Sequence, residues 1–266
     1  MVREPTVAGM FYPGEAGSLK SDMSRLIPVS EERRRVVGLI APHAGYVYSG
    51  ACAGKAYARV EIPASVIILG VNHRGFGYSF AVDGHQYWQT PLGNASIDTE
   101  LAEKLVEQSR IFQIDSNAGR QEHSLEVQVP FIQTLKPEAK IVPITVSSAN
   151  LDDLLTAGTE LGELLDKEES VMMVASTDMS HYIDARTADI QDQKAIDKIM
   201  NLNPDGLFKV VIQEDISMCG VAPTVIMLTA ARKAGARKAE IVEYTHSGKV
   251  SGDYGQVVAY LSVLVY

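Results

Sequence analysis

Three of the six histidines follow the same kind of segment. His43, His73 and His181 each lie within a few residues of the end of a short aliphatic run. Such runs predict strands buried on both faces, and open α/β sheets bind ligands beyond the carboxyl ends of their strands. One histidine in that position is more often a structural residue, but three indicate a common site. Because imidazole is a ligand for iron, zinc and copper, the pattern predicts a metal site.

Two residues are candidates for an anionic ligand beside these histidines. Asp178 is the one carboxylate in a comparable position after a strand, and Cys219 lies in a glycine-containing turn directly before a predicted helix. The positive end of a helix dipole lowers the pKa of a thiol and favours the thiolate, which makes Cys219 the better candidate. The alternative is that Cys219 is a buried, inert cysteine, as we expect for Cys52.

Asp178 and His181 lie three residues apart, and a helical turn would direct both side chains into one cavity. A carboxylate beside an imidazole raises its basicity, so this pair suits a general base. The alternative is an aspartate that caps a helix and a partly exposed histidine. Tyr46 and Tyr48 either line the pocket or pack on neighbouring helices.

His123 is a weaker candidate for the pocket. Glu122 precedes it, and a helix N-terminus with a glutamate in its first turn explains the pair without chemistry. The sequence contains no Walker motif, no dinucleotide-binding glycine motif after a strand and no nucleophile elbow. A metal site is therefore the chemistry that the sequence favours.

Alternating strands and helices must position these residues. The strands at 36–41 and 64–71 are about one βαβ unit apart, so we expect the imidazoles of His43 and His73 to lie side by side. The remaining segments predict helices at 18–27, 47–60, 99–108, 121–135, 150–167, 187–200, 204–212 and 221–234, a β excursion at 78–96, and strands at 112–114, 141–146, 171–176, 241–245 and 257–266. We also expect an N-terminal arm at 4–14 whose aromatic residues pack onto the domain. The pattern predicts one α/β domain over residues 1–266, a sandwich with a central, mostly parallel or mixed sheet flanked by helices.

The composition limits which kinds of molecule the protein is expected to bind. The net charge of -9 argues against nucleic acid, so a small molecule or a protein is expected. Residues 36–54 are uncharged but contain four glycines, a proline and a histidine, which predicts a soluble fold with no membrane span. Two cysteines and no signal segment predict a cytoplasmic location.

Five motifs together resemble the Memo family. They occur in the family's order at 41–46, 72–73, 122–128, 176–181 and 219–220, and the likeness extends to residues 3–13 and 251–254. The family's fold is similar to that of class III (LigB-type) extradiol dioxygenases, which open catechol rings with non-haem Fe(II). The resemblance implies that His43, His73 and Cys219 bind metal, that His181 is the base and that Asp178 lies beside it.

The resemblance leaves two functions open. The first is an Fe(II)-dependent oxidoreductase that acts with O2 on a small catechol-like aromatic substrate. A thiolate in place of the dioxygenase carboxylate also suits copper or zinc. With zinc in the site, the protein would be a hydrolase that uses metal-bound water. The second is a non-enzymatic protein that binds a peptide, a phosphopeptide or a metal. The resemblance also implies AMMECR-type and radical-SAM proteins as partners.

Overall fold

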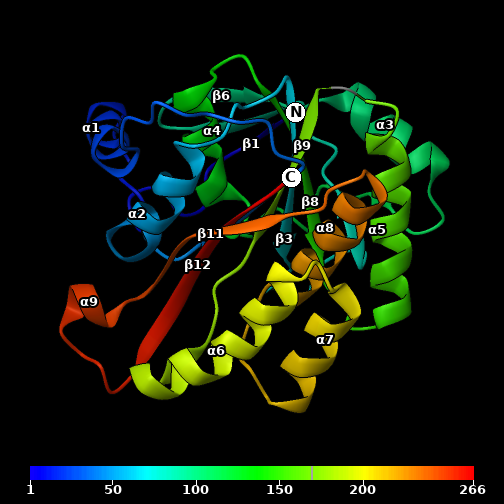
Figure 1. Ribbon diagram of the computed structural model, residues 1–266. Coiled ribbons are helices and arrows are strands. Elements are labelled where there is room, and N and C mark those ends of the chain that lie inside the picture. The colour runs from blue at the N-terminus through cyan, green and yellow to red at the C-terminus, as the bar shows by residue number, and fades with distance from the viewer. Residues whose placement is uncertain (169) are drawn as a thin grey trace.

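A large mixed sheet forms the centre of the computed structural model, which describes residues 1–168 and 170–266 (Figure 1). Its strand order is β10-β12-β2-β9-β3-β8-β4-β7, and β11 pairs with β12. The central strands are parallel: β2 (Gly38–Ala41), β9 (Val171–Ser176), β3 (Ser65–Val71) and β8 (Lys140–Val146). They contain almost only buried aliphatic and small residues, as expected for strands covered on both faces.

Antiparallel strands extend this sheet on both sides. The strand β12 (Val257–Val265) pairs with β2, with β11 (Ala239–His246) and with β10 (His181–Ile183). On the other side lie β4 (Phe80–Val82) and β7 (Gln113–Ile114). A small separate sheet contains β1 (Val2–Arg3), β5 (Tyr87–Thr90) and β6 (Gly93–Ser96).

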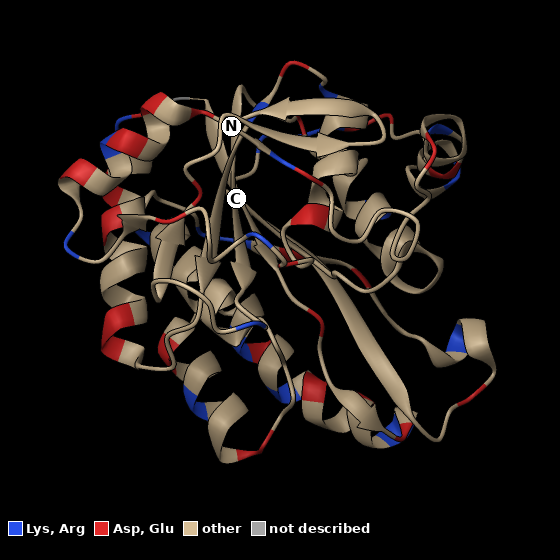
Figure 2. Ribbon diagram, turned by 180° about the vertical axis from the view of Figure 1, so that it is seen from behind, with Lys and Arg blue, Asp and Glu red and all other residues tan. Residues whose placement is uncertain are grey.

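Helices cover both faces of the large sheet and enclose two hydrophobic cores. One core lies under α1 (Ala16–Leu26), α2 (Tyr46–Tyr57) and α4 (Val129–Leu135). The other lies under α3 (Thr99–Gln108), α5 (Leu151–Leu165), α6 (Ala185–Met200), α7 (Pro204–Gln213) and α8 (Val221–Lys233). Charged residues lie on the helices and loops, whereas the central strands are nearly free of charge (Figure 2).

This architecture confirms the predicted α/β fold with its mixed, mostly parallel sheet. One predicted helix differs: residues 121–125 are irregular, and a 3-10 turn (Glu126–Gln128) precedes α4. The predictions also missed β1, β10 and the short helix α9 (Gly248–Ser251), which are too short to show a periodic pattern. Among the described helices none is long and apolar enough to span a membrane.

Candidate metal centre

The carboxyl ends of β2, β9 and β3 share one edge of the sheet. Ala41 pairs with Ser176, and Leu69 pairs with Ala175, so His43, Asp178 and His73 all follow at this edge. Although β9 separates β2 from β3, the ring centroids of His43 and His73 are 5.5 Å apart. The prediction that these two imidazoles lie side by side is confirmed.

A third histidine completes the cluster. His43, His73 and His123 each offer a donor atom, and these atoms lie within 4.8 Å of one another. His43 is buried, His123 is partly exposed and His73 is exposed, so the cluster opens toward solvent. His123 comes from the irregular segment before the 3-10 turn. Sequence reasoning expected it only as a pocket residue, because Glu122 next to it had an explanation as part of a helix terminus.

Hydrogen bonds fix which nitrogen carries the proton in two of the three rings. His73 Nδ1 donates to Oε1 of Glu122 at 2.9 Å, since a carboxylate oxygen can only accept. His123 Nδ1 lies 3.3 Å from the same oxygen, as a charge contact and not a hydrogen bond. His43 Nδ1 lies 3.1 Å from Ser176 Oγ. That hydroxyl donates its own proton to the Ser124 carbonyl, so it accepts from His43. The Nε2 atoms of His43 and His73 therefore keep their lone pairs, as metal ligands require.

The electrostatics of the site favour neutral imidazoles. Burial, followed by the charge of His73, lowers the pKa of His43 to about 3. Burial and His43 likewise lower the pKa of His123 to about 4. For Glu122, burial would raise the pKa, but its bonds to His73 and to the backbone of Ser124 lower it to about 2. At neutral pH the Glu122 carboxylate is thus ionised, and His43 and His123 need lose no proton to bind a metal.

Cys219 lies beside this cluster but is not part of it within the described residues. Its Sγ is 3.2 Å from His43 Nε2, and the Asp178 amide donates to it at 3.3 Å. Burial and the nearby Asp178 raise the pKa of the Cys219 thiol to about 12. The expected lowering of this pKa by the dipole of α8 is therefore wrong, because desolvation and the carboxylate outweigh the dipole. The thiol would have to lose its proton to become a ligand.

Asp178 and His181 face the same cavity, but a helical turn does not connect them. His181 begins β10 instead. The Asp178 carboxylate accepts the His43 amide at 2.8 Å, and burial raises its pKa to about 6. His181 Nδ1 lies 2.9 Å from the Ser217 carbonyl, which can only accept, so His181 Nε2 is free to take up a proton.

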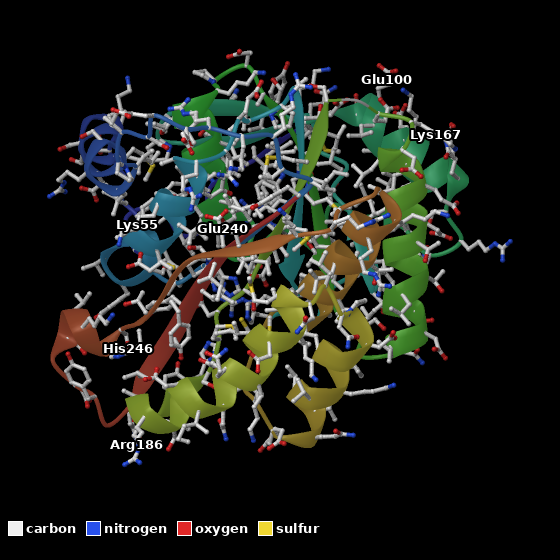
Figure 3. The ribbon with its side chains drawn as sticks, viewed as in Figure 1. Lys55, Glu100, Lys167, Arg186, Glu240 and His246 are labelled. Atoms are coloured by element: carbon white, nitrogen blue, oxygen red, sulfur yellow. The ribbon has the colours of Figure 1, made fainter. Side chains whose placement is uncertain are left out.

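The cavity in front of the cluster has a volume of about 470 Å³. Its lining contains His43, His73, His123, Asp178 and His181 together with the aromatic rings of Phe11, Tyr48, Tyr182 and Tyr260. Tyr46 lies outside this lining, since its buried hydroxyl donates to the Val127 carbonyl at 2.6 Å. Cys52 is buried, as predicted. His246 lies at the end of β11, near α9 (Figure 3).

Tyr182 is the strained residue at this cavity. Its φ is +59°, a value that L-residues rarely adopt, and its pairing register with β12 is broken as in a β-bulge. The side chain is 73% exposed, so packing contributes little to compensate for the strain. A left-handed conformation costs such a residue ~1 to 2 kcal/mol.

We therefore expect Tyr182→Asn to raise the free energy of unfolding by ~1 kcal/mol, because asparagine tolerates this conformation. Chemical denaturation measures the change. Tyr254→Asn, at a similarly exposed tyrosine without positive φ, is the matched control and should give no gain. Equal changes in the free energy of unfolding for the two substitutions would refute the inference that the backbone of Tyr182 is strained.

Comparison with known proteins gives full-length matches. A family model described as Memo-like protein matches residues 3–264. A MEMO1 family protein of Aquifex aeolicus is 42% identical over 99% of this chain and 98% of its own length, and one of Methanosarcina barkeri is 37% identical over 99% and 100%. The crystal structure of an uncharacterized protein from Escherichia coli K12 shares the fold, with a TM-score of 0.59 and 16% identity over 86% of this chain and 99% of that one.

Proposed function

The chain belongs to the Memo family, and from this membership and its histidine cluster we propose that it is a metal-dependent oxidoreductase acting on a small catechol-like aromatic. One observation carries the proposal: three histidines that line one cavity each offer a ring nitrogen, and these donor atoms lie within 4.8 Å of one another. Three neutral imidazoles are a donor set that iron, copper and zinc all accept. The residues present therefore fit a bound metal ion.

We assign the ligands from the distances in the cluster. His43, His73 and His123, whose donor atoms lie within 4.8 Å of one another, would hold the ion. Cys219 lies outside this group, so its Sγ would have to move toward His73 and His123 to join them as the anionic donor. Ligand atoms ~2.0 to 2.3 Å from one ion lie ~3 to 4 Å apart, and the 3.2 Å between Cys219 Sγ and His43 Nε2 falls in that range. Bound Fe(II) would supply the electron-transfer and oxygen chemistry that side chains lack.

His181 has the geometry of the general base. Because the Ser217 carbonyl holds its Nδ1 proton, Nε2 can accept the proton of a substrate hydroxyl and later return it. The buried Asp178, whose pKa burial raises to about 6, lines the same cavity as His181. Aromatic side chains on the cavity wall suit a flat aromatic substrate, and the volume suits a small one.

The experiment is oxygen uptake by the protein loaded anaerobically with Fe(II) and then mixed with catechols of increasing size. Consumption of oxygen with loss of the catechol absorbance supports the proposal. Zinc retained at full occupancy, with no oxygen consumed, would point to a hydrolase instead. Absence of any stoichiometric metal would favour the peptide- or phosphopeptide-binding alternative.

Proton release on metal binding tests the role of Cys219. His43 and His123, with pKa values lowered to about 3 and about 4, are neutral at pH 7.5, whereas a thiol with its pKa raised to about 12 is protonated. We expect one proton to be released for each Co(II) bound, and none in Cys219→Ser. Calorimetric titration in two buffers of different ionisation enthalpy measures this number. A value of zero for the wild type would remove Cys219 from the ligand set.

A further inference from the structure

Arg3 is a buried cation remote in sequence from the metal cluster but joined to the segment that carries it. Its side chain is 2% exposed and forms an ion pair of 2.7 Å with Glu126. Its Nε donates to the Gly119 carbonyl at 2.9 Å, and Nη2 donates to the Glu122 carbonyl at 2.8 Å. The guanidinium also lies over the Trp88 ring, 4.0 Å from its centroid. Arg3 thus holds both ends of the irregular turn at 119–122.

Glu126 fixes the N-terminal arm to the other side of the same segment. Its two carboxylate oxygens accept from Arg3, from the amides of Thr6 and Val7 at 2.8 and 3.0 Å, and from the Tyr12 hydroxyl at 2.7 Å. The residue is fully buried. The predicted packing of the arm on the domain is therefore made by a charged network as well as by its aromatic residues.

The network surrounds the residues that orient two of the three imidazoles. Glu122, whose carbonyl Arg3 holds, binds His73 and His123 through its carboxylate. Phe11 of the arm lies against the His123 ring at a centroid distance of 4.8 Å, and its carbonyl accepts the Tyr46 amide at 2.7 Å. Because residues 121–125 form no regular helix, few backbone hydrogen bonds of their own hold them in place.

We propose that Arg3 and Glu126 are positioning residues for the metal site: they hold the backbone of 119–126 so that Glu122 can orient His73 and His123. The inference rests on the metal binding in the proposed function, not on the oxidation of a substrate. Residues that orient metal ligands typically change metal affinity 10- to 100-fold when removed. Since Arg3 acts through Glu122, we expect the lower end of that range.

The test is the Kd for Co(II) of the full-length protein, measured by calorimetry for Arg3→Met and for the double variant Arg3→Met/Glu126→Gln. The single variant leaves the Glu126 carboxylate buried without its cation and should lower Tm. The double variant removes this unpaired charge and keeps an amide oxygen that can accept from Thr6 or Val7, so it should recover part of the loss. In both variants we expect the Kd to rise about tenfold, because the carbonyls of Gly119 and Glu122 lose their donor. Leu161→Ala, in the core under α5, is the control that lowers Tm and keeps the Kd of the wild type.

Nitrogen NMR of the histidine rings in the metal-free protein gives a second readout. The wild type should show His73 as a single Nδ1-protonated tautomer, because its Nδ1 donates to Glu122, and Arg3→Met should show a mixture of tautomers. An unchanged Kd in Arg3→Met, a Kd that recovers with Tm in the double variant, or a wild type that binds no Co(II) would overturn the inference. A wild type that binds Co(II) but oxidises no aromatic would refute the proposed function alone.

Discussion

Replacing His181 with glutamine is expected to lower kcat for catechol oxidation by ~10²- to 10⁴-fold, the range that a positioned acid–base group contributes. His181 Nδ1 is held by the Ser217 carbonyl, so its free Nε2 faces the cavity that it lines with the histidine cluster. Glutamine can still donate a hydrogen bond but cannot exchange a proton near neutral pH. Oxygen-uptake kinetics with the iron-loaded variant measure the loss.

The metal content of this variant distinguishes a base from a ligand. We expect His181→Gln to bind one Fe(II) with the affinity of the wild type, because His181 is outside the cluster whose donor atoms converge. His85→Gln is the matched control: His85 pairs with Asp83 and does not line the cavity, so activity should be unchanged. Full activity in His181→Gln, or loss of iron from it, would refute the assignment of His181 as the base.

Replacing His43 with glutamine is expected to abolish stoichiometric iron binding. Its ring lies edge-on to both others, with centroids 5.5 Å from His73 and 5.4 Å from His123. Its Nε2 also contacts Cys219 Sγ at 3.2 Å. Loss of a ligand should cost more than the 10- to 100-fold that loss of an orienting residue costs. Anaerobic titration with Fe(II), followed by elemental analysis after desalting, gives the result.

His85→Gln again serves as the control and should bind one ion. Thermal unfolding of His43→Gln should show that the variant is folded, since glutamine can replace the hydrogen bond to Ser176. Iron bound by folded His43→Gln at the affinity of the wild type would exclude the histidine cluster as the metal site.

The sequence predicted the parts of the site that follow central strands. The aliphatic runs of β2, β3 and β9 identify these strands, and parallel strands bring His43, His73 and Asp178 to one edge whatever the strand order. That order could not be predicted, and β9 proved to lie between β2 and β3.

The remaining parts depend on contacts between segments distant in the chain. His123 joins the cluster because its ring stacks on that of His73 at 4.8 Å and because Glu122, its neighbour in the chain, binds His73 Nδ1 from 49 residues away. No local pattern indicates these contacts. The pKa of Cys219 depends on burial and on Asp178, which come from tertiary packing. The cytoplasmic location and the AMMECR-type and radical-SAM partners come only from composition and family resemblance, and they stay predictions.

X-ray absorption spectroscopy of the protein loaded with one equivalent of Fe(II) is the most direct test of the metal centre. We predict one iron per chain, with several imidazole ligands and one sulfur in its coordination shell, and loss of this spectrum in His43→Gln. A protein that takes up no stoichiometric iron, or an iron shell of oxygen ligands without imidazole scattering, would contradict the existence of this centre.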